Sequence, residues 1–140
     1  MSPKWLIPII IFFGVYALSS QGLKGGPEVS AKEAAGLMAG APRPVVIDVR
    51  ERTDYDQGHI ASAISVPSAE FNGRLESLKL PKFDPVIIYS ADDARARDVT
   101  KHLYESGYQG VLTLKGGIDA WRAAGQAIQI HKAAPPAAKP

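Results

Sequence analysis

The chain has 140 residues and a formal net charge of +2, with 46% hydrophobic and 21% charged residues. This length fits one ordinary domain with an appendage, and the scattered lysines and arginines argue against a nucleic-acid partner. The chain contains no cysteine, which excludes disulfides, thiolate catalysis and cysteine-based metal or iron–sulfur sites.

Residues 1–27 form a hydrophobic segment that we expect to lie outside the globular fold. An apolar run from Trp5 to Leu18 follows Lys4. It is short for a membrane-spanning helix, which needs about 20 residues, but the small and weakly polar residues that follow can extend it. The predicted membrane residues are Trp5, Leu6, Ile9, Ile10, Ile11, Phe12, Phe13, Val15, Tyr16 and Leu18.

The same segment has the features of a secretory signal peptide, with a basic start, an apolar centre and small residues at cleavage-like spacing. We favour a retained anchor, and cleavage would instead leave a soluble periplasmic protein. Lys4 and the amino terminus favour a cytoplasmic N-terminus and a domain on the periplasmic side, whereas Lys24 and Lys32 weigh the other way.

The globular part begins with a predicted helix and a predicted strand. Ser30 and Glu33 form a capping box, which opens a helix that runs to about Met38. Residues 44–49 are a buried-type strand, because their apolar residues follow one another without alternation. Thr53 is expected to cap a short helical turn after this strand.

The middle of the chain repeats this alternation. A short strand at 63–66 precedes a helix that Ser68 is expected to cap and that runs through Leu78. A second continuous apolar strand, 86–89, leads into a helix over about 94–106, whose apolar positions follow the 3.6-residue period.

A third strand at 111–114 and a helix at 118–124 complete the domain, which we place at residues 28–130. From Gln126 the chain is expected to be a flexible tail that ends in the Ala/Pro-rich residues 131–140. Alternating strands and helices predict an α/β fold, in which a parallel sheet carries helices on both faces.

Ligands of such folds bind beyond the carboxyl ends of the strands. Asp48 and Arg50 at one strand end and the segment 90–95 at another are therefore expected on the same rim. Segment 90–95 leads from a strand into a helix N-terminus, where backbone N–H groups attract anions and nucleophiles are often placed. The residue at this turn is Ser90.

Five segments give the chain a family resemblance. They read VIDVRE at 46–51, YDQGHI at 55–60, AISVP at 63–67, PVIIY at 85–89 and GYQGVLTLKGGIDAW at 107–121. In this order and spacing they resemble a single rhodanese (sulfurtransferase) domain over residues 29–130. A local departure is Ala61-Ser62, where the family usually has Pro-Gly.

The resemblance implies a six-residue loop that begins with a cysteine, which carries sulfane sulfur as a persulfide, and that usually ends in arginine. Ser90 takes the cysteine position, Arg95 matches the arginine, and Asp93 stands where glycine is common. We therefore interpret the loop as degenerate and expect no catalytic residue in it. Its residues are Ser90, Ala91, Asp92, Asp93, Ala94 and Arg95.

A serine hydroxyl forms no persulfide and needs an adjacent general base to act as a nucleophile. His102 lies about two helical turns beyond Arg95, and His59 belongs to the fold in the family pattern. Asp92 or Asp93 is a conceivable base, but we expect one of these carboxylates to cap the helix N-terminus, where the helix dipole favours it. It would then fill the place of a substrate anion.

Several polar residues near the rim are candidates for binding. Asp48 with Arg50 is more typical of a brace between loops, and Trp121 is expected to pack its helix on the sheet. Arg95 and Arg97 either clamp an anionic partner or offset the neighbouring aspartates. The candidate binding residues are Asp48, Arg50, Asp92, Asp93, Arg95 and Arg97.

We therefore expect a catalytically inactive rhodanese-like interaction module, anchored in a membrane as an accessory subunit of an integral membrane protein complex. Alternatives are a secreted periplasmic protein with a cleaved signal, and a weak serine-based or partner-thiol-dependent enzyme. No cofactor is expected, and no metal, because the three histidines lie far apart without ligand spacing.

Overall fold

The structure is a computed structural model that describes residues 27–130. The elements in chain order are β1 (Glu28–Val29), α2 (Ala31–Ala39), β2 (Val45–Asp48), α3 (Arg52–Gln57), β3 (His59–Ile60), β4 (Ile64–Ser65), the 3-10 turn η1 (Ser68–Glu70), α4 (Phe71–Leu78), β5 (Val86–Tyr89), α5 (Asp93–Glu105), β6 (Val111–Leu114), α6 (Gly117–Ala123) and β7 (Ile128–Gln129).

Five strands form one parallel sheet in the order β1-β6-β5-β2-β4. The strands β3 and β7 pair separately and antiparallel. The predicted α/β class with a parallel sheet is therefore confirmed. The predicted anchor at 1–27 lies outside the described residues except for Pro27, and so does the tail at 131–140. Within 27–130, no helix has the length and apolar character needed to cross a membrane.

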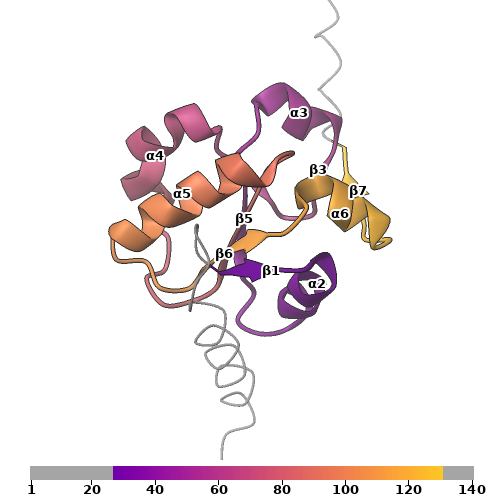
Figure 1. Cartoon of the computed structure of the whole chain (residues 1–140), viewed down its shortest axis with the longest axis horizontal. Helices are drawn as coiled ribbons and strands as arrows, with labels where there is room; N and C mark the ends of the chain where they lie inside the picture. Colours follow the sequence, from indigo (N-terminus) through magenta and orange to yellow (C-terminus); the bar gives the residue numbers. More distant parts are fainter. Residues whose placement is uncertain (1–26, 131–140) are drawn as a thin grey trace, which may run out of the picture.

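Helices cover both faces of the sheet (Figure 1). Alternate residues of β5 point to opposite faces: Ile87 and Tyr89 join a core with α2 and α6, whereas Val86 and Ile88 join a core with α4 and α5. This explains the continuous apolar strand, because each residue meets a covered face. Complete burial of a side chain such as Ile87 contributes about 1.5–3 kcal/mol.

Two predicted helix features are confirmed. Ser30 caps α2, since its Oγ accepts a hydrogen bond from the backbone N–H of Glu33 at 3.1 Å and contacts Oε1 of Glu33 at 3.0 Å. The apolar stripe of α5, Ala96, Val99 and Leu103, is buried against the sheet. The 3.6-residue period thus identified the face of α5 that packs.

Two predicted caps are wrong. Thr53 lies inside α3, whose N-cap is Glu51, and Ser68 lies inside η1, whose N-cap is Pro67. Neither cap residue makes a side-chain hydrogen bond to its helix. Glu51 has an extended backbone where the chain leaves β2, and Pro67 is the N-cap where it leaves β4, so the two N-caps lie two residues before Thr53 and one residue before Ser68.

The expectation of a flexible tail from Gln126 is also wrong for the residues that the structure describes. Ile128 and Gln129 form β7, which pairs with β3. The indole Nε1 of Trp121 donates to the carbonyl oxygen of Ala127 at 3.0 Å and holds the preceding turn. Two-residue strands such as β7 carry no periodic signal, and pairing with β3 stabilises this one.

Candidate functional site

The rim at the carboxyl ends of β2 and β5 brings Asp48 and Arg50 beside the loop that follows Tyr89, since Asp48 is in register with Tyr89. The Arg50 guanidinium donates three hydrogen bonds to the Asp48 carboxylate, the shortest from Nη2 to Oδ2 at 2.7 Å. Nη2 also donates to the carbonyl oxygen of Gly58 at 2.6 Å. Both side chains are buried, so this pair acts as a brace between β2 and the end of α3, and its binding role stays a prediction.

The brace changes the acidity of its neighbours. Burial alone would lower the pKa of Arg50, but the hydrogen bonds and charge of Asp48 outweigh it and raise that pKa above its ordinary value. Burial, reinforced by the Asp48 carboxylate, raises the pKa of Tyr89 far above its ordinary value. The Tyr89 hydroxyl accepts a hydrogen bond from the backbone N–H of Ile60 at 3.1 Å. Arg50 therefore stays charged and Tyr89 stays neutral across physiological pH.

The Ser90 side chain is buried and is not exposed to solvent at the rim. Its side chain is 1% exposed, and its Oγ has no hydrogen-bonding partner among the described residues. Its carbonyl oxygen accepts from the backbone N–H of Ile118 at 3.2 Å. A Cβ atom on Gly117 would overlap that carbonyl oxygen, and Gly117 also has a positive φ of 59°. Only glycine fits there, and it lets the β6–α6 turn close over Ser90.

The two aspartates of the loop have separate roles. Oδ1 of Asp92 accepts a hydrogen bond from the backbone N–H of Arg95 at 2.9 Å, so Asp92 is the N-cap of α5 and the predicted carboxylate cap is confirmed. The Asp93 carboxylate instead accepts from the backbone N–H of Gly116, at 3.0 and 3.2 Å. Asp93 thus ties the loop to the same turn that covers Ser90.

The two arginines point to different partners. Nε of Arg97 lies 2.6 Å from Oε1 of Glu28, and its Nη2 lies 3.7 Å from Oδ2 of Asp93. The hydrogen bond to Glu28 raises the pKa of Arg97 above its ordinary value. Arg95 makes a looser contact, 3.9 Å, with the exposed Glu51. The geometry of Arg97 favours an internal link between β1 and α5 over a clamp on a partner.

Neither described histidine supplies a base to Ser90. The ring of His59 stacks on Tyr55, with centroids 3.8 Å apart, and its Nδ1 lies 2.9 Å from the Tyr55 carbonyl oxygen. His102 lies further along α5, and no hydrogen bond joins either ring to Oγ of Ser90. Within 27–130, no group of three or more histidine, aspartate or glutamate residues is arranged to hold a metal.

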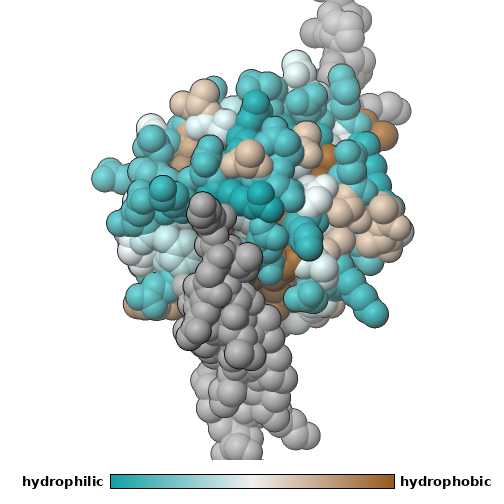
Figure 2. Space-filling model, in the orientation of Figure 1, coloured by the Kyte–Doolittle hydropathy of each residue, from teal (hydrophilic) through white to brown (hydrophobic). Residues whose placement is uncertain are grey.

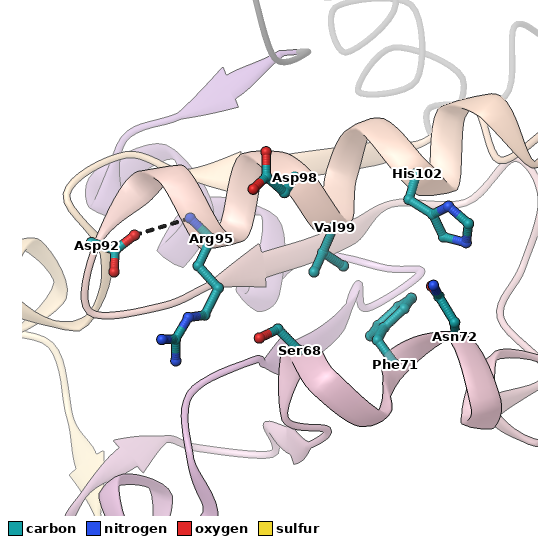
Figure 3. A pocket seen from close by; sticks show the side chains of 8 residues that line it. All are labelled: Ser68, Phe71, Asn72, Asp92, Arg95, Asp98, Val99 and His102. Atoms are coloured by element: carbon teal, nitrogen blue, oxygen red, sulfur yellow. Dashed lines mark hydrogen bonds between the residues drawn. The ribbon is translucent and has the colours of Figure 1, made fainter.

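A pocket of about 460 Å³ lies between the η1–α4 segment and one side of α5 (Figure 3). Ser90 is not part of its lining. No sequence pattern indicates this pocket, because its wall comes from two segments that share no motif. Only the spacing of its polar residues along α5 hinted at a common face. The lining residues are Ser68, Phe71, Asn72, Asp92, Arg95, Asp98, Val99 and His102.

Comparison with known proteins agrees with this fold. The model of the rhodanese-like domain family matches residues 30–124. A thiosulfate sulfurtransferase GlpE of Coxiella burnetii is 34% identical over 79 residues, which cover 56% of this chain and 72% of that protein. A sulfurtransferase of Allochromatium vinosum is 30% identical over 94 residues, which cover 67% of this chain and 86% of that protein.

The solved structures give the same result. The NMR structure of the rhodanese-like domain from the Anabaena Alr3790 protein is 31% identical and superposes with a TM-score of 0.67, covering 81% of this chain and 87% of that one. The family model spans more than half of the 140 residues. The chain has the parallel sheet, the Asp48–Arg50 brace and the strand–loop–helix around Ser90 described above. It belongs to the rhodanese-like domain family.

Proposed function

We propose that this chain is a catalytically inactive rhodanese-like interaction module. In this proposal it is anchored in a membrane by its N-terminal segment, faces the periplasm and serves as an accessory subunit of a membrane protein complex. Relatives from Coxiella burnetii and Allochromatium vinosum are named sulfurtransferases. The persulfide chemistry that the family resemblance implies needs a thiol, and this chain has no cysteine.

The observation that carries the proposal is the state of Ser90. A serine nucleophile requires a base within hydrogen-bond reach to take its proton. The Ser90 hydroxyl is buried and has no partner among the described residues. It therefore lacks both an activating base and a route for a substrate, which argues against a serine-based enzyme.

The aspartates add a second obstacle to sulfur transfer. A loop that holds thiosulfate or a persulfide anion must offer it unoccupied N–H donors and positive potential. In this loop the Asp92 carboxylate occupies a donor at the start of α5, and the Asp93 carboxylate occupies the N–H of Gly116. Two negative charges also stand where a substrate anion would approach. Loss of the nucleophile is thus accompanied by loss of the anion site.

The intact fold supports a binding role for the domain. The sheet, both cores and the Asp48–Arg50 brace are intact. The described part of the face carrying α4 and α5 is mostly hydrophilic (Figure 2). A partner that contacts this face would meet charged and polar groups rather than a broad apolar surface, as in interfaces that assemble from separately folded subunits.

The catalytic half of the proposal is tested by sulfur transfer from thiosulfate to cyanide. Full-length wild-type protein and Ser90→Ala are expected to give the same background rate. Ser90→Cys alone should recover little activity because both aspartates remain, and the Ser90→Cys/Asp93→Gly double variant should recover more. A wild-type rate that disappears in Ser90→Ala would instead establish a serine-dependent enzyme.

The membrane half is tested by the intact mass of the endogenous protein. Recovery from the membrane fraction with residues 1–18 present supports an anchor. A mature protein that starts after this segment, found in the soluble periplasmic fraction, would replace the anchored subunit with a secreted rhodanese-like protein.

A further inference from the structure

We infer that the edge of the sheet formed by the amino ends of its strands docks onto the anionic lipid headgroups of the membrane. This inference rests on the proposed anchor and goes beyond it, because it assigns an orientation to the domain. The surface consists of three loops, residues 40–44, 79–85 and 106–110, which we name the basic edge.

The topology brings these loops together. They directly precede β2, β5 and β6, which are parallel neighbours in the sheet. The amino ends of parallel neighbours lie at the same edge. Two of the loops are also bonded directly, since the backbone N–H of Gln109 donates to the Lys82 carbonyl oxygen at 2.7 Å. The backbone N–H of Val86, the first residue of β5, donates to the Gly110 carbonyl oxygen at 2.9 Å.

The charge of this edge differs from that of the opposite one. The three loops contain Arg43, Lys79 and Lys82 against a single acidic residue, Asp84, so three positive charges minus one negative charge leave +2. All four residues are exposed. The segments 49–51, 66–67, 90–92 and 115–116, which follow the main strands, contain two basic and two acidic residues and sum to zero.

Phe83 stands between these charges. It is 65% exposed and is the one aromatic residue among the exposed large hydrophobic residues of the described chain. Its neighbour Lys82 is fixed, because its Nζ donates to the Ser106 carbonyl oxygen at 3.0 Å and lies 3.7 Å from the centre of the Tyr108 ring. An exposed aromatic residue among cations has the composition of a membrane-interface contact, in which the ring enters the headgroup layer and the cations meet lipid phosphates.

The link to the N-terminal segment is the reason for proposing a lipid bilayer as the partner of the basic edge. β1 runs parallel to β6, and the Pro27 carbonyl oxygen accepts from the backbone N–H of Thr113, so the preceding chain joins from the amino side of the sheet. Residues 19–26 link the apolar run to this strand and span at most about 29 Å when fully extended. An anchor in the bilayer would therefore hold the basic edge within short reach of the headgroups and raise its effective concentration there.

The test uses the absence of cysteine, which makes any introduced cysteine a unique labelling site. Gln109→Cys places a fluorophore on the basic edge beside Phe83 without replacing it, and Thr53→Cys places one on exposed α3 at the other edge. The full chain is reconstituted in lipid nanodiscs, which leave both bilayer faces open to iodide as a water-soluble quencher. One set of discs contains phosphatidylglycerol, and the other contains only phosphatidylcholine.

In anionic discs the label at position 109 is expected to be shielded from iodide and the label at position 53 to stay accessible. The shielding should weaken in phosphatidylcholine discs. Lys79→Gln should lower the ratio of docked to undocked domain about fivefold, whereas Lys115→Gln at the opposite edge should leave it unchanged. Phe83→Ser should also reduce the shielding.

Three results would overturn the inference in distinguishable ways. If the protein enters the discs but both labels are quenched equally, the basic edge does not dock and the anchor still stands. If the protein fails to enter discs of either composition, the proposed anchor itself is wrong, and the lipid-facing edge is wrong with it. Equal shielding in both compositions would remove the role of anionic headgroups.

Discussion

The buried hydroxyl of Ser90 is a polar group that the fold encloses without a partner. Leaving such a group unsatisfied costs about 1–3 kcal/mol relative to its hydration in the unfolded chain. Ser90→Ala removes this cost and gives up only the packing of one oxygen atom. We therefore expect the free energy of unfolding to rise by about 1 kcal/mol, which corresponds to roughly 4–8 °C in Tm for a domain of this size.

The matched control is a buried hydroxyl with a partner. Oγ1 of Thr100 lies 2.8 Å from Oγ1 of Thr113, and both residues are buried. Thr100→Val keeps the shape but leaves the Thr113 hydroxyl unpaired, so it should lower the free energy of unfolding by about 1–3 kcal/mol. Urea unfolding, followed by the fluorescence of the buried Trp121, measures both variants under the same conditions.

Opposite signs for the two variants are the expected result. If Ser90→Ala lowers stability as Thr100→Val does, the Ser90 hydroxyl makes a hydrogen bond in the folded protein. Its enclosure could then no longer be used as an argument against activation, and the case for an inactive site would rest on the missing cysteine and the aspartates alone.

Four further outcomes are expected. Asp92→Ala removes the N-cap of α5 and should cost about 1 kcal/mol in urea unfolding. Asp48→Asn leaves a buried guanidinium without its counter-charge and should cost about 3–5 kcal/mol, seen as a large fall in Tm. Gly117→Ala should prevent native folding by circular dichroism, whereas Gly36→Ala, an open helical position, should stabilise by about 0.5–1 kcal/mol. Because the folded pKa of Tyr89 lies above its unfolded value of about 10, its contribution to stability is present below that pH and is lost as pH rises above it. Unfolding curves measured at increasing alkaline pH check this, and Tyr89→Phe should lose less stability over the same range.

Elements with a strong local signal were predictable from the sequence. The strands at 86–89 and 111–114 match β5 and β6 at both ends, because an uninterrupted apolar run needs both faces of a sheet covered. The helix near Ala94 was placed to within one residue, since its apolar stripe and the preceding aspartates mark its face and its start. These are features that single residues and their spacing determine.

Elements that depend on tertiary partners were not predictable. β1, β3 and β7 have two residues each and exist through pairing with distant strands. The helix starts assigned to Thr53 and Ser68 failed because the path of the chain out of β2 and β4 decided where each helix begins. In the site, the sequence indicated the Asp92 cap. The hydrogen bond from the Gly116 N–H to the Asp93 carboxylate joins residues of separate loops, so no local sequence pattern indicates it.

The most direct test of the central claim is native-gel migration of the endogenous protein after mild detergent extraction of membranes, with mass spectrometry of the band. An inactive, anchored accessory subunit should co-migrate with a large complex and retain its N-terminal segment. Migration as a small species in the soluble fraction, without residues 1–18, would contradict the account.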